Sequence, residues 1–181
     1  MCSSDLVCAS TRVLTHLLKA DIVPILLCKS SLKCVVPLLR KLVEYVKARV
    51  PEDAVLMFHQ TWAYAPKSNH GGFVNYDRDQ MKMYNAIVKT VNQEAPKVGI
   101  KLIIPCGTAI QNARTSALGT DLTRDGFHLS FAHGRYIASC TWLEAVLGVN
   151  PIGNTYCPEG MTPQECRLAQ KAAHKAVNLP T

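Results

Sequence analysis

The chain has 181 residues, of which 48% are apolar and 18% charged, a composition suited to one globular domain with a sizeable core. The formal charge of +7 comes from 20 basic residues that are spread along the chain. This spread indicates a solvated surface and argues against a nucleic-acid partner. No segment reaches the ~18 consecutive apolar residues of a membrane span, so no membrane partner is expected.

The first half of the chain alternates apolar runs with a helical pattern. Asp21 to Leu27 is predicted to be a buried strand that contains a proline. Residues 37–50 are predicted to form an amphipathic helix with basic residues on its outer face. Ala54 to His59 is the next short apolar run and a second predicted strand.

The next two elements complete an alternating pattern. Residues 76–94 carry apolar side chains at helical spacing, and Gly99 to Pro105 is a third apolar run. Strands separated by helices favour βαβ units, in which a parallel sheet is covered on both faces. The fold class expected from the pattern is therefore α/β.

The last part of the chain is predicted to be mainly helical. A helix over residues 132–147 should end at Gly148, and a linker rich in Pro and Gly follows over residues 151–160. Thr162 can cap the terminal helix, with Glu165 reaching back to it.

Polar residues follow the second and third predicted strands, and a third polar cluster lies further along the chain. Because the carboxyl ends of parallel strands gather at one edge of a sheet, we expect these clusters to form one pocket. The candidate substrate-binding residues are His59, Gln60, Trp62, Tyr64, Gln111 and Asn112.

The third cluster holds Asp125 and His128, a spacing that suits a catalytic pair. A carboxylate that binds one imidazole nitrogen fixes the tautomer and leaves the other nitrogen free to take a proton. Alternatively, Asp125 caps the helix that begins near Ser130, and His128 satisfies a backbone carbonyl.

Ordinary structural roles compete with the other assignments. His59 and Trp62 could fill the core at a strand end, and Gln111 and Asn112 could build a loop or a helix start. His70 is expected to be an exposed loop histidine. The Cys106 thiol could serve as a nucleophile, although a buried cysteine at a strand end is the ordinary case.

The residues around Asp125 and His128 carry a resemblance. The string from Gly119 to Ser130 resembles the C-terminal catalytic block of the SGNH (GDSL-type) hydrolases, whose last motif is Asp-x-x-His. Further strings resemble one branch of that superfamily, which is classed as a domain of unknown function: His59 to Tyr64, Pro105 to Arg114 and Gly134 to Glu144. The similar region spans about residues 44–148.

The resemblance implies a three-layer αβα sandwich with a parallel, flavodoxin-like sheet. It also implies serine-dependent hydrolysis of small-molecule or carbohydrate esters without a metal or other cofactor. Asp125 would orient His128, which would act first as general base and then as general acid. No cluster with metal-ligand spacing is present in the sequence.

The chain departs from that superfamily near its start. The superfamily carries its serine in a Gly-Asp/Asn-Ser motif after the first strand, whereas here no glycine precedes Gly71. We therefore expect residues 1–40 to be an atypical, foreign or frame-shifted segment of a truncated chain that lacks the first strand. Residues 41–150 would be the hydrolase-like part, and residues 151–181 a linker and helix. Such a chain should be nearly inert.

The eight cysteines suggest buried thiols in a reducing compartment, with a disulfide between Cys157 and Cys166 as the exception. The start of the chain lacks a signal peptide, so the expected location is the cytosol, or outside it for a longer parent protein.

A second functional hypothesis is a carbohydrate-binding module without catalysis, in which Trp62, Tyr64 and His59 stack on a sugar. The oligomeric state is left open.

Overall fold

The computed structural model describes residues 32–179, so the predicted strand at residues 21–27 lies outside the described part. The described chain mixes helices with two short strands. Its elements are α3 (Leu32–Lys47), β1 (Met57–His59), the 3-10 helix η1 (Gly71–Tyr76), α4 (Gln80–Glu94), the 3-10 helix η2 (Pro96–Val98), β2 (Leu102–Ile104), α5 (Cys106–Arg114), α6 (His133–Leu147) and α7 (Pro163–Asn178). Within this range, none of the helices combines the length and apolar character needed to cross a bilayer.

The strands β1 and β2 form a small parallel sheet, as the alternating pattern predicted. Met57 pairs with Leu102 and His59 with Ile104. Both strands are shorter than the apolar runs that contain them. The first run starts at residues 54 and 55, which are exposed, and only its last residues pair with β2. The described fold is therefore a mixed α/β arrangement around two parallel strands.

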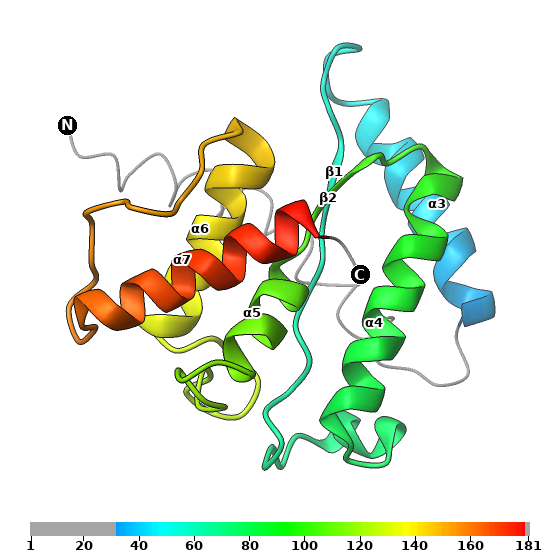
Figure 1. Cartoon of the computed structure of the whole chain (residues 1–181). Coiled ribbons are helices and arrows are strands. Elements are labelled where there is room, and N and C mark those ends of the chain that lie inside the picture. Colours follow the sequence, from blue (N-terminus) through cyan, green and yellow to red (C-terminus); the bar gives the residue numbers. More distant parts are fainter. Residues whose placement is uncertain (1–31, 180–181) are drawn as a thin grey trace.

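Helices lie on both sides of the strand pair (Figure 1). α3 and α4 are on one side, and α5, α6 and α7 are on the other. The second group packs closely because α7 presents small side chains: Ala169, Ala173 and Ala176 are fully buried against α5 and α6. α4 and η1 form a separate apolar cluster around Phe73 and Met83.

The predicted helix ends are correct at several positions and wrong at others. Gly148 ends α6 with a φ of +67°, a left-handed conformation that favours glycine. Thr162 and Glu165 form the predicted capping box at the start of α7. α4 begins later than predicted because the Asp79 carboxylate accepts a hydrogen bond from the Lys82 amide and so caps the helix there.

α3 begins at Leu32 and ends at Lys47, which corrects the predicted range of 37–50. Pro37 lies inside this helix, where it removes one helical hydrogen bond without ending the helix. Leu39 and Val43, one turn apart, pack against the segment that contains η2.

The disulfide between Cys157 and Cys166 is present, as predicted. It joins the linker after α6 to the first turn of α7. Two further cysteines, Cys106 and Cys140, are free and buried.

Candidate functional site

A short hairpin positions Asp125 and His128. Thr123 and Leu129 form an antiparallel bridge, and the Arg124 amide donates a hydrogen bond of 2.9 Å to the His128 carbonyl. At the tip, Gly126 has a φ of +88°, which strains any residue with a side chain. The backbone pairing fixes the loop that carries both side chains, between α5 and α6 in the sequence.

The Asp125 carboxylate binds His128 directly. His128 Nδ1 lies 2.6 Å from Asp125 Oδ2. The other oxygen, Oδ1, accepts hydrogen bonds from the backbone amides of His128 at 2.7 Å and Phe127 at 3.1 Å. The carboxylate occupies Nδ1, so Nε2 is the nitrogen that can exchange a proton with a substrate.

The charge state of Asp125 follows from these contacts. Partial desolvation raises the pKa of Asp125, but the hydrogen bonds from the His128 side chain and from two backbone amides outweigh it. The resulting pKa is lowered to about 2, so Asp125 is ionised at neutral pH. The His128 side chain is 54% exposed and accessible to a ligand.

Asp125 does not cap the following helix, so that alternative is wrong. α6 begins at His133, and Ser130 Oγ accepts the hydrogen bond from the Gly134 amide at 2.9 Å. Ser130 therefore accepts a hydrogen bond from the first turn of α6, whereas the Asp125 carboxylate binds the hairpin backbone and the His128 side chain.

The segment after β1 holds the hairpin from one side. Trp62 Nε1 donates a hydrogen bond of 2.7 Å to the Phe127 carbonyl. The Ala65 amide donates to the Gly126 carbonyl at 2.8 Å. Ser68 packs so closely that a side chain at Gly126 would lie about 3.0 Å from its Oγ. Trp62 thus positions the hairpin that carries the Asp125–His128 pair.

The Phe127 ring connects the pair to further aromatic rings. The Phe127 ring lies 4.2 Å from the His128 ring, 4.8 Å from that of His70 and 6.0 Å from that of Tyr64, measured between centroids. His70 was expected to be an exposed loop histidine. It is instead half-buried, because its Nδ1 accepts a hydrogen bond from the Gly72 amide and its ring packs against Tyr64. Phe127 lies between Gly126 and His128 but is not among the candidate residues predicted from the sequence.

His59 lies among aromatic side chains. Its ring centroid is 5.6 Å from that of Trp142 and 6.1 Å from that of Trp62. Its Nε2 is shielded from solvent and has no hydrogen-bond partner among the described residues. Burial lowers the pKa of His59 to about 4, so the ring is neutral at pH 7. This environment favours the core-filling alternative for His59.

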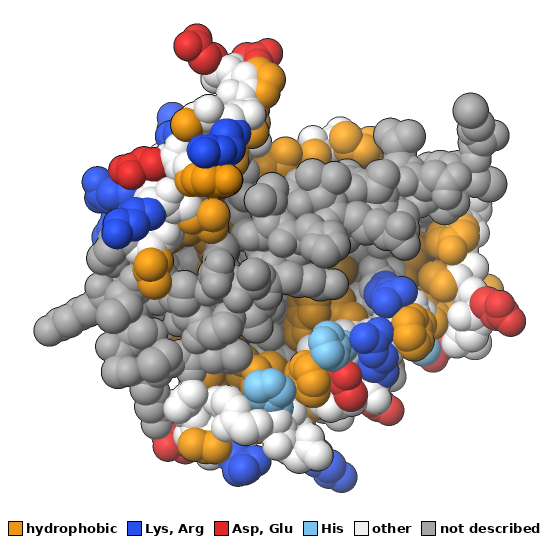
Figure 2. Space-filling model, turned by 180° about the vertical axis from the view of Figure 1, so that it is seen from behind, with side chains coloured by type: hydrophobic (Ala, Val, Ile, Leu, Met, Phe, Trp, Pro, Cys, Tyr) orange, Lys and Arg blue, Asp and Glu red, His pale blue; other side chains and the backbone are white. Residues whose placement is uncertain are grey.

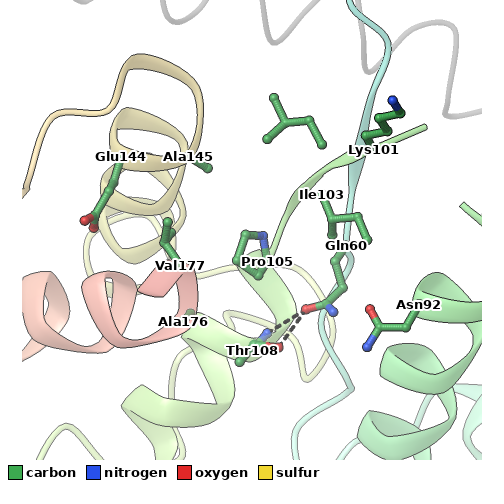
Figure 3. A pocket seen from close by; sticks show the side chains of 11 residues that line it. Gln60, Asn92, Lys101, Ile103, Pro105, Thr108, Glu144, Ala145, Ala176 and Val177 are labelled. Carbon is green, nitrogen blue, oxygen red and sulfur yellow. Dashed lines mark hydrogen bonds between the residues drawn. The ribbon is translucent and has the colours of Figure 1, made fainter. Parts of the chain in front are cut away.

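Gln60 binds the first turn of α5. Its Oε1 accepts hydrogen bonds from the Thr108 amide at 2.9 Å and from the Thr108 hydroxyl at 3.0 Å, as Figure 3 shows. Gly107 allows this close approach, since a Cβ there would lie 2.0 Å from the Thr61 carbonyl oxygen. Gln60 is 3% exposed, and it caps a helix rather than facing the Asp125–His128 pair.

Gln60 also lines a cavity of about 290 Å³ beside β2 (Figure 3). The other side chains around this cavity come from β2 and its flanking residues, from α4, from the first turn of α5, and from the C-terminal ends of α6 and α7. None of them belongs to the 122–130 hairpin. The cavity and the Asp125–His128 pair are therefore separate features.

Gln111 and Asn112 point away from each other because residues 106–114 form α5 rather than a loop. The side-chain oxygen of Gln111 accepts a hydrogen bond from Gln80 at the start of α4. Asn112 Nδ2 donates to the Ala172 carbonyl of α7 at 3.2 Å. Successive helical residues lie about 100° apart around the axis, so these two join α5 to different helices. These contacts support the alternative in which Gln111 and Asn112 have structural roles.

Arg114 supports the segment after β1 from inside the molecule. Its Nη2 donates a hydrogen bond of 2.9 Å to the Ala63 carbonyl. The residue is 7% exposed, and burial lowers the pKa of the guanidinium to about 10. It therefore carries its charge at neutral pH and anchors the chain just after Trp62.

Cys106 does not fit the role of a nucleophile. It is fully buried, and its thiol lies 3.8 Å from the Ala138 carbonyl oxygen. Burial raises the pKa of the Cys106 thiol, which disfavours the reactive thiolate. Among the described residues, no group of three or more His, Cys, Asp or Glu side chains could hold a metal ion.

Comparison with known proteins identifies the family of this chain, a family defined by a domain of unknown function. The family model "Domain of unknown function (DUF4886)" matches residues 29–176. The crystal structure of a DUF4886 family protein from Bacteroides uniformis is 51% identical to this chain, with a TM-score of 0.80. The similarity covers 87% of this chain and 60% of that one, so the chain spans less than two thirds of its relative. No curated protein matches. The extent of the family match shows that the chain belongs to the DUF4886 family.

Proposed function

We propose that this chain carries the acid–base half of an SGNH-type serine ester hydrolase that acts on acyl esters of small molecules or carbohydrates. The observation that carries the proposal is the 2.6 Å contact between Asp125 and His128 on a fixed, solvent-exposed hairpin. A histidine held by a carboxylate at Nδ1, with Nε2 facing a ligand, is the arrangement that activates a hydroxyl nucleophile. Helices on both sides of a parallel strand pair support the proposed αβα sandwich.

In the proposed reaction, His128 Nε2 takes the proton of a serine hydroxyl as the serine oxygen attacks the ester carbonyl. The tetrahedral oxyanion collapses, the bond to the alcohol breaks, and the imidazolium returns its proton to the leaving alcohol. Water then attacks the acyl-serine with the same assistance, which releases the acid and restores serine. Asp125 keeps the imidazole oriented and stabilises its charged form through both steps.

The nucleophile is the part that the described residues do not supply. Among the side chains that the structure describes, no hydroxyl or thiol group is hydrogen-bonded to His128. Catalytic residues of this kind act as a unit, so the pair alone should retain little activity. We therefore expect this chain to be nearly inert in ester hydrolysis.

The carbohydrate-binding alternative requires exposed aromatic rings. Tyr64 is only 7% exposed, and the Trp62 indole N–H is bound to the Phe127 carbonyl. Tyr64 therefore leaves little ring surface for stacking on a sugar, and Trp62 is partly buried and bound to the hairpin through its N–H group. This observation favours the hydrolase over the binding module.

The Cys157–Cys166 disulfide supports the alternative location outside the cytosol, because disulfides persist in oxidising compartments.

The test compares this chain with its longer Bacteroides uniformis relative. Hydrolysis of p-nitrophenyl acetate and of acetylated xylo-oligosaccharides is measured for both, and labelling by a fluorophosphonate probe reports a reactive serine. We expect turnover and labelling in the relative. Replacing the histidine that aligns with His128 by alanine should lower its turnover by about 10³-fold or more. This chain should show neither turnover nor labelling.

Two results would contradict the proposal. One is turnover by the relative that survives replacement of its aligned histidine. The other is ester hydrolysis by this chain that is abolished in His128→Ala, because the pair would then work without a separate serine.

A further inference from the structure

An exposed phenylalanine beside the Asp125–His128 pair holds two arginines. The Phe131 side chain is 66% exposed. Arg124 Cζ lies over its ring at 4.9 Å from the ring centre, and Arg135 Cζ at 4.5 Å. Both arginines are exposed. An exposed aromatic ring that carries two guanidinium groups concentrates positive charge at one point of the surface.

This charge lies at the edge of the candidate catalytic pair. Arg124 Nε is 3.9 Å from Asp125 Oδ2, the oxygen that also binds His128. The Arg124 amide pairs with the His128 carbonyl across the hairpin, so the two residues keep a fixed relation. Arg135 comes from the first turn of α6, which contains no acidic residue. The positive end of the helix dipole therefore adds to the charge of Arg135.

Stacking leaves the hydrogen-bonding edges of a guanidinium open. A guanidinium that lies over a ring uses its face for the ring and keeps its N–H groups for an acceptor. In the described part of the chain, neither guanidinium has a hydrogen bond, and Asp125 is the only carboxylate in ion-pair contact with Arg124. That carboxylate is already engaged by His128. Figure 2 shows a face of the molecule on which basic, acidic and histidine side chains lie beside exposed apolar ones.

We propose that Arg124, Phe131 and Arg135 form a carboxylate-binding clamp, and that the esters taken by this site carry a carboxylate. The proposal rests on the proposed hydrolase function, because it names the substrate class of the same site. Planar guanidinium groups bind carboxylates through paired, charge-assisted hydrogen bonds. The carboxylate can belong to the alcohol side of the ester, as in a uronic sugar, or to the acyl side, as in a hemiester of a dicarboxylic acid.

The test measures binding, so it does not depend on turnover. The full chain is titrated with galacturonate, with galactose, which has a neutral CH₂OH in place of the carboxylate, and with succinate. Binding is followed by calorimetry and by the Cε1–H resonance of His128. Galacturonate binding shows a carboxylate on the alcohol side, and succinate binding shows one on the acyl side. We expect at least one of them to bind about tenfold or more tightly than galactose.

Three variants locate the binding. The double variant Arg124→Gln/Arg135→Gln should weaken binding of the carboxylate ligand by about tenfold or more, while Arg40→Gln on α3 leaves it unchanged. Phe131→Leu keeps both charges and should weaken binding by about threefold, because the guanidinium groups lose their support. These side chains are exposed, so circular dichroism spectra and melting temperatures should stay unchanged.

Four outcomes overturn the clamp: no binding of either carboxylate, galactose binding as tightly as both carboxylates, binding that survives in the double variant, or carboxylate binding that leaves the His128 resonance unmoved. Failure of the hydrolase proposal gives a different result. In that case carboxylate binding and its dependence on the arginines persist, while the relative shows no histidine-dependent hydrolysis. If only the clamp fails, hydrolysis by the relative remains and carboxylate binding is absent.

Discussion

Two regions of the molecule each hold a histidine–carboxylate pair, and the two pairs have different roles. In the hairpin, His128 Nδ1 lies 2.6 Å from Asp125, and between α6 and α7, His174 Nδ1 lies 2.7 Å from Glu144. The Glu144 side chain is only 9% exposed and also accepts a hydrogen bond from Asn178 at 2.8 Å. That pair joins two packed helices, whereas the hairpin pair presents an exposed imidazole.

A third pair, His133 and Glu165 at 3.1 Å, follows the structural pattern. Glu165 already belongs to the capping box of α7, and hydrogen bonds from Thr162 and from His133 lower its pKa to about 2. A histidine–carboxylate contact by itself therefore does not mark a functional site. The hairpin pair is distinguished because its carboxylate orients an accessible imidazole.

The largest expected effect concerns His59, a half-buried counterpart of the exposed His128 with a shielded Nε2. Its pKa is about 4 in the folded chain and 6.5 when unfolded, so the unfolded state binds more protons between these values. Stability should rise as the pH increases from 4 to 6.5, by about 3 kcal/mol at most. Urea unfolding of the wild type and of His59→Phe at several pH values checks this. Parallel pH profiles for the two proteins would show that His59 is not the source.

The next effect separates the two kinds of pair. His174→Ala leaves the buried Glu144 carboxylate without its imidazole and should lower the free energy of unfolding by about 2 kcal/mol. His128→Ala removes an exposed side chain and should change stability by less than about 0.5 kcal/mol. Urea titration at pH 7 measures both. Equal losses would remove the distinction between the two regions.

A smaller effect tests how firmly the hairpin is held. Gly126→Ala places a Cβ in a left-handed backbone and against Ser68, and should cost about 1–2 kcal/mol. Gly119→Ala is the matched control, because Gly119 has a φ of +73° but nothing within 4 Å of the added Cβ. It should cost about 1 kcal/mol or less. A loss of stability at Gly126 no larger than at Gly119 would mean that Ser68 moves easily to make room for the added Cβ.

The smallest expected effect concerns the bond that fixes the hairpin to the segment after β1. Trp62→Phe keeps an aromatic ring and removes the N–H group that donates to the Phe127 carbonyl. The loss should be about 1 kcal/mol, with a shift of the backbone amide resonances of the hairpin. Unchanged amide resonances there would show that other contacts position the loop.

Local patterns in the sequence predicted much of the fold. The parallel strands, the Gly148 helix end, the capping box at Thr162 and the Cys157–Cys166 disulfide each depend on residues close in sequence or on periodicity. The Asp125–His128 contact likewise follows from its short spacing.

The remaining site depended on contacts that no local pattern encodes. Pro105 precedes α5 and its side chain cannot cap a helix, so no local pattern predicts where α5 begins. The prediction that Gln111 and Asn112 line a pocket was made without this helix. Gln60 acts on Thr108, which lies 48 residues away in the sequence. The two arginines meet at Phe131 only because the hairpin folds back toward α6.

The central claim is that Asp125 holds His128 with Nε2 ready to accept a proton, and the imidazole tautomer tests it most directly. A long-range ¹H–¹⁵N spectrum of the histidine side chains at neutral pH distinguishes the two nitrogens of each ring. We predict that neutral His128 carries its proton on Nδ1 in the wild type and changes to a mixture of tautomers in Asp125→Asn. A wild-type His128 protonated on Nε2, or a tautomer unchanged by Asp125→Asn, would contradict the account.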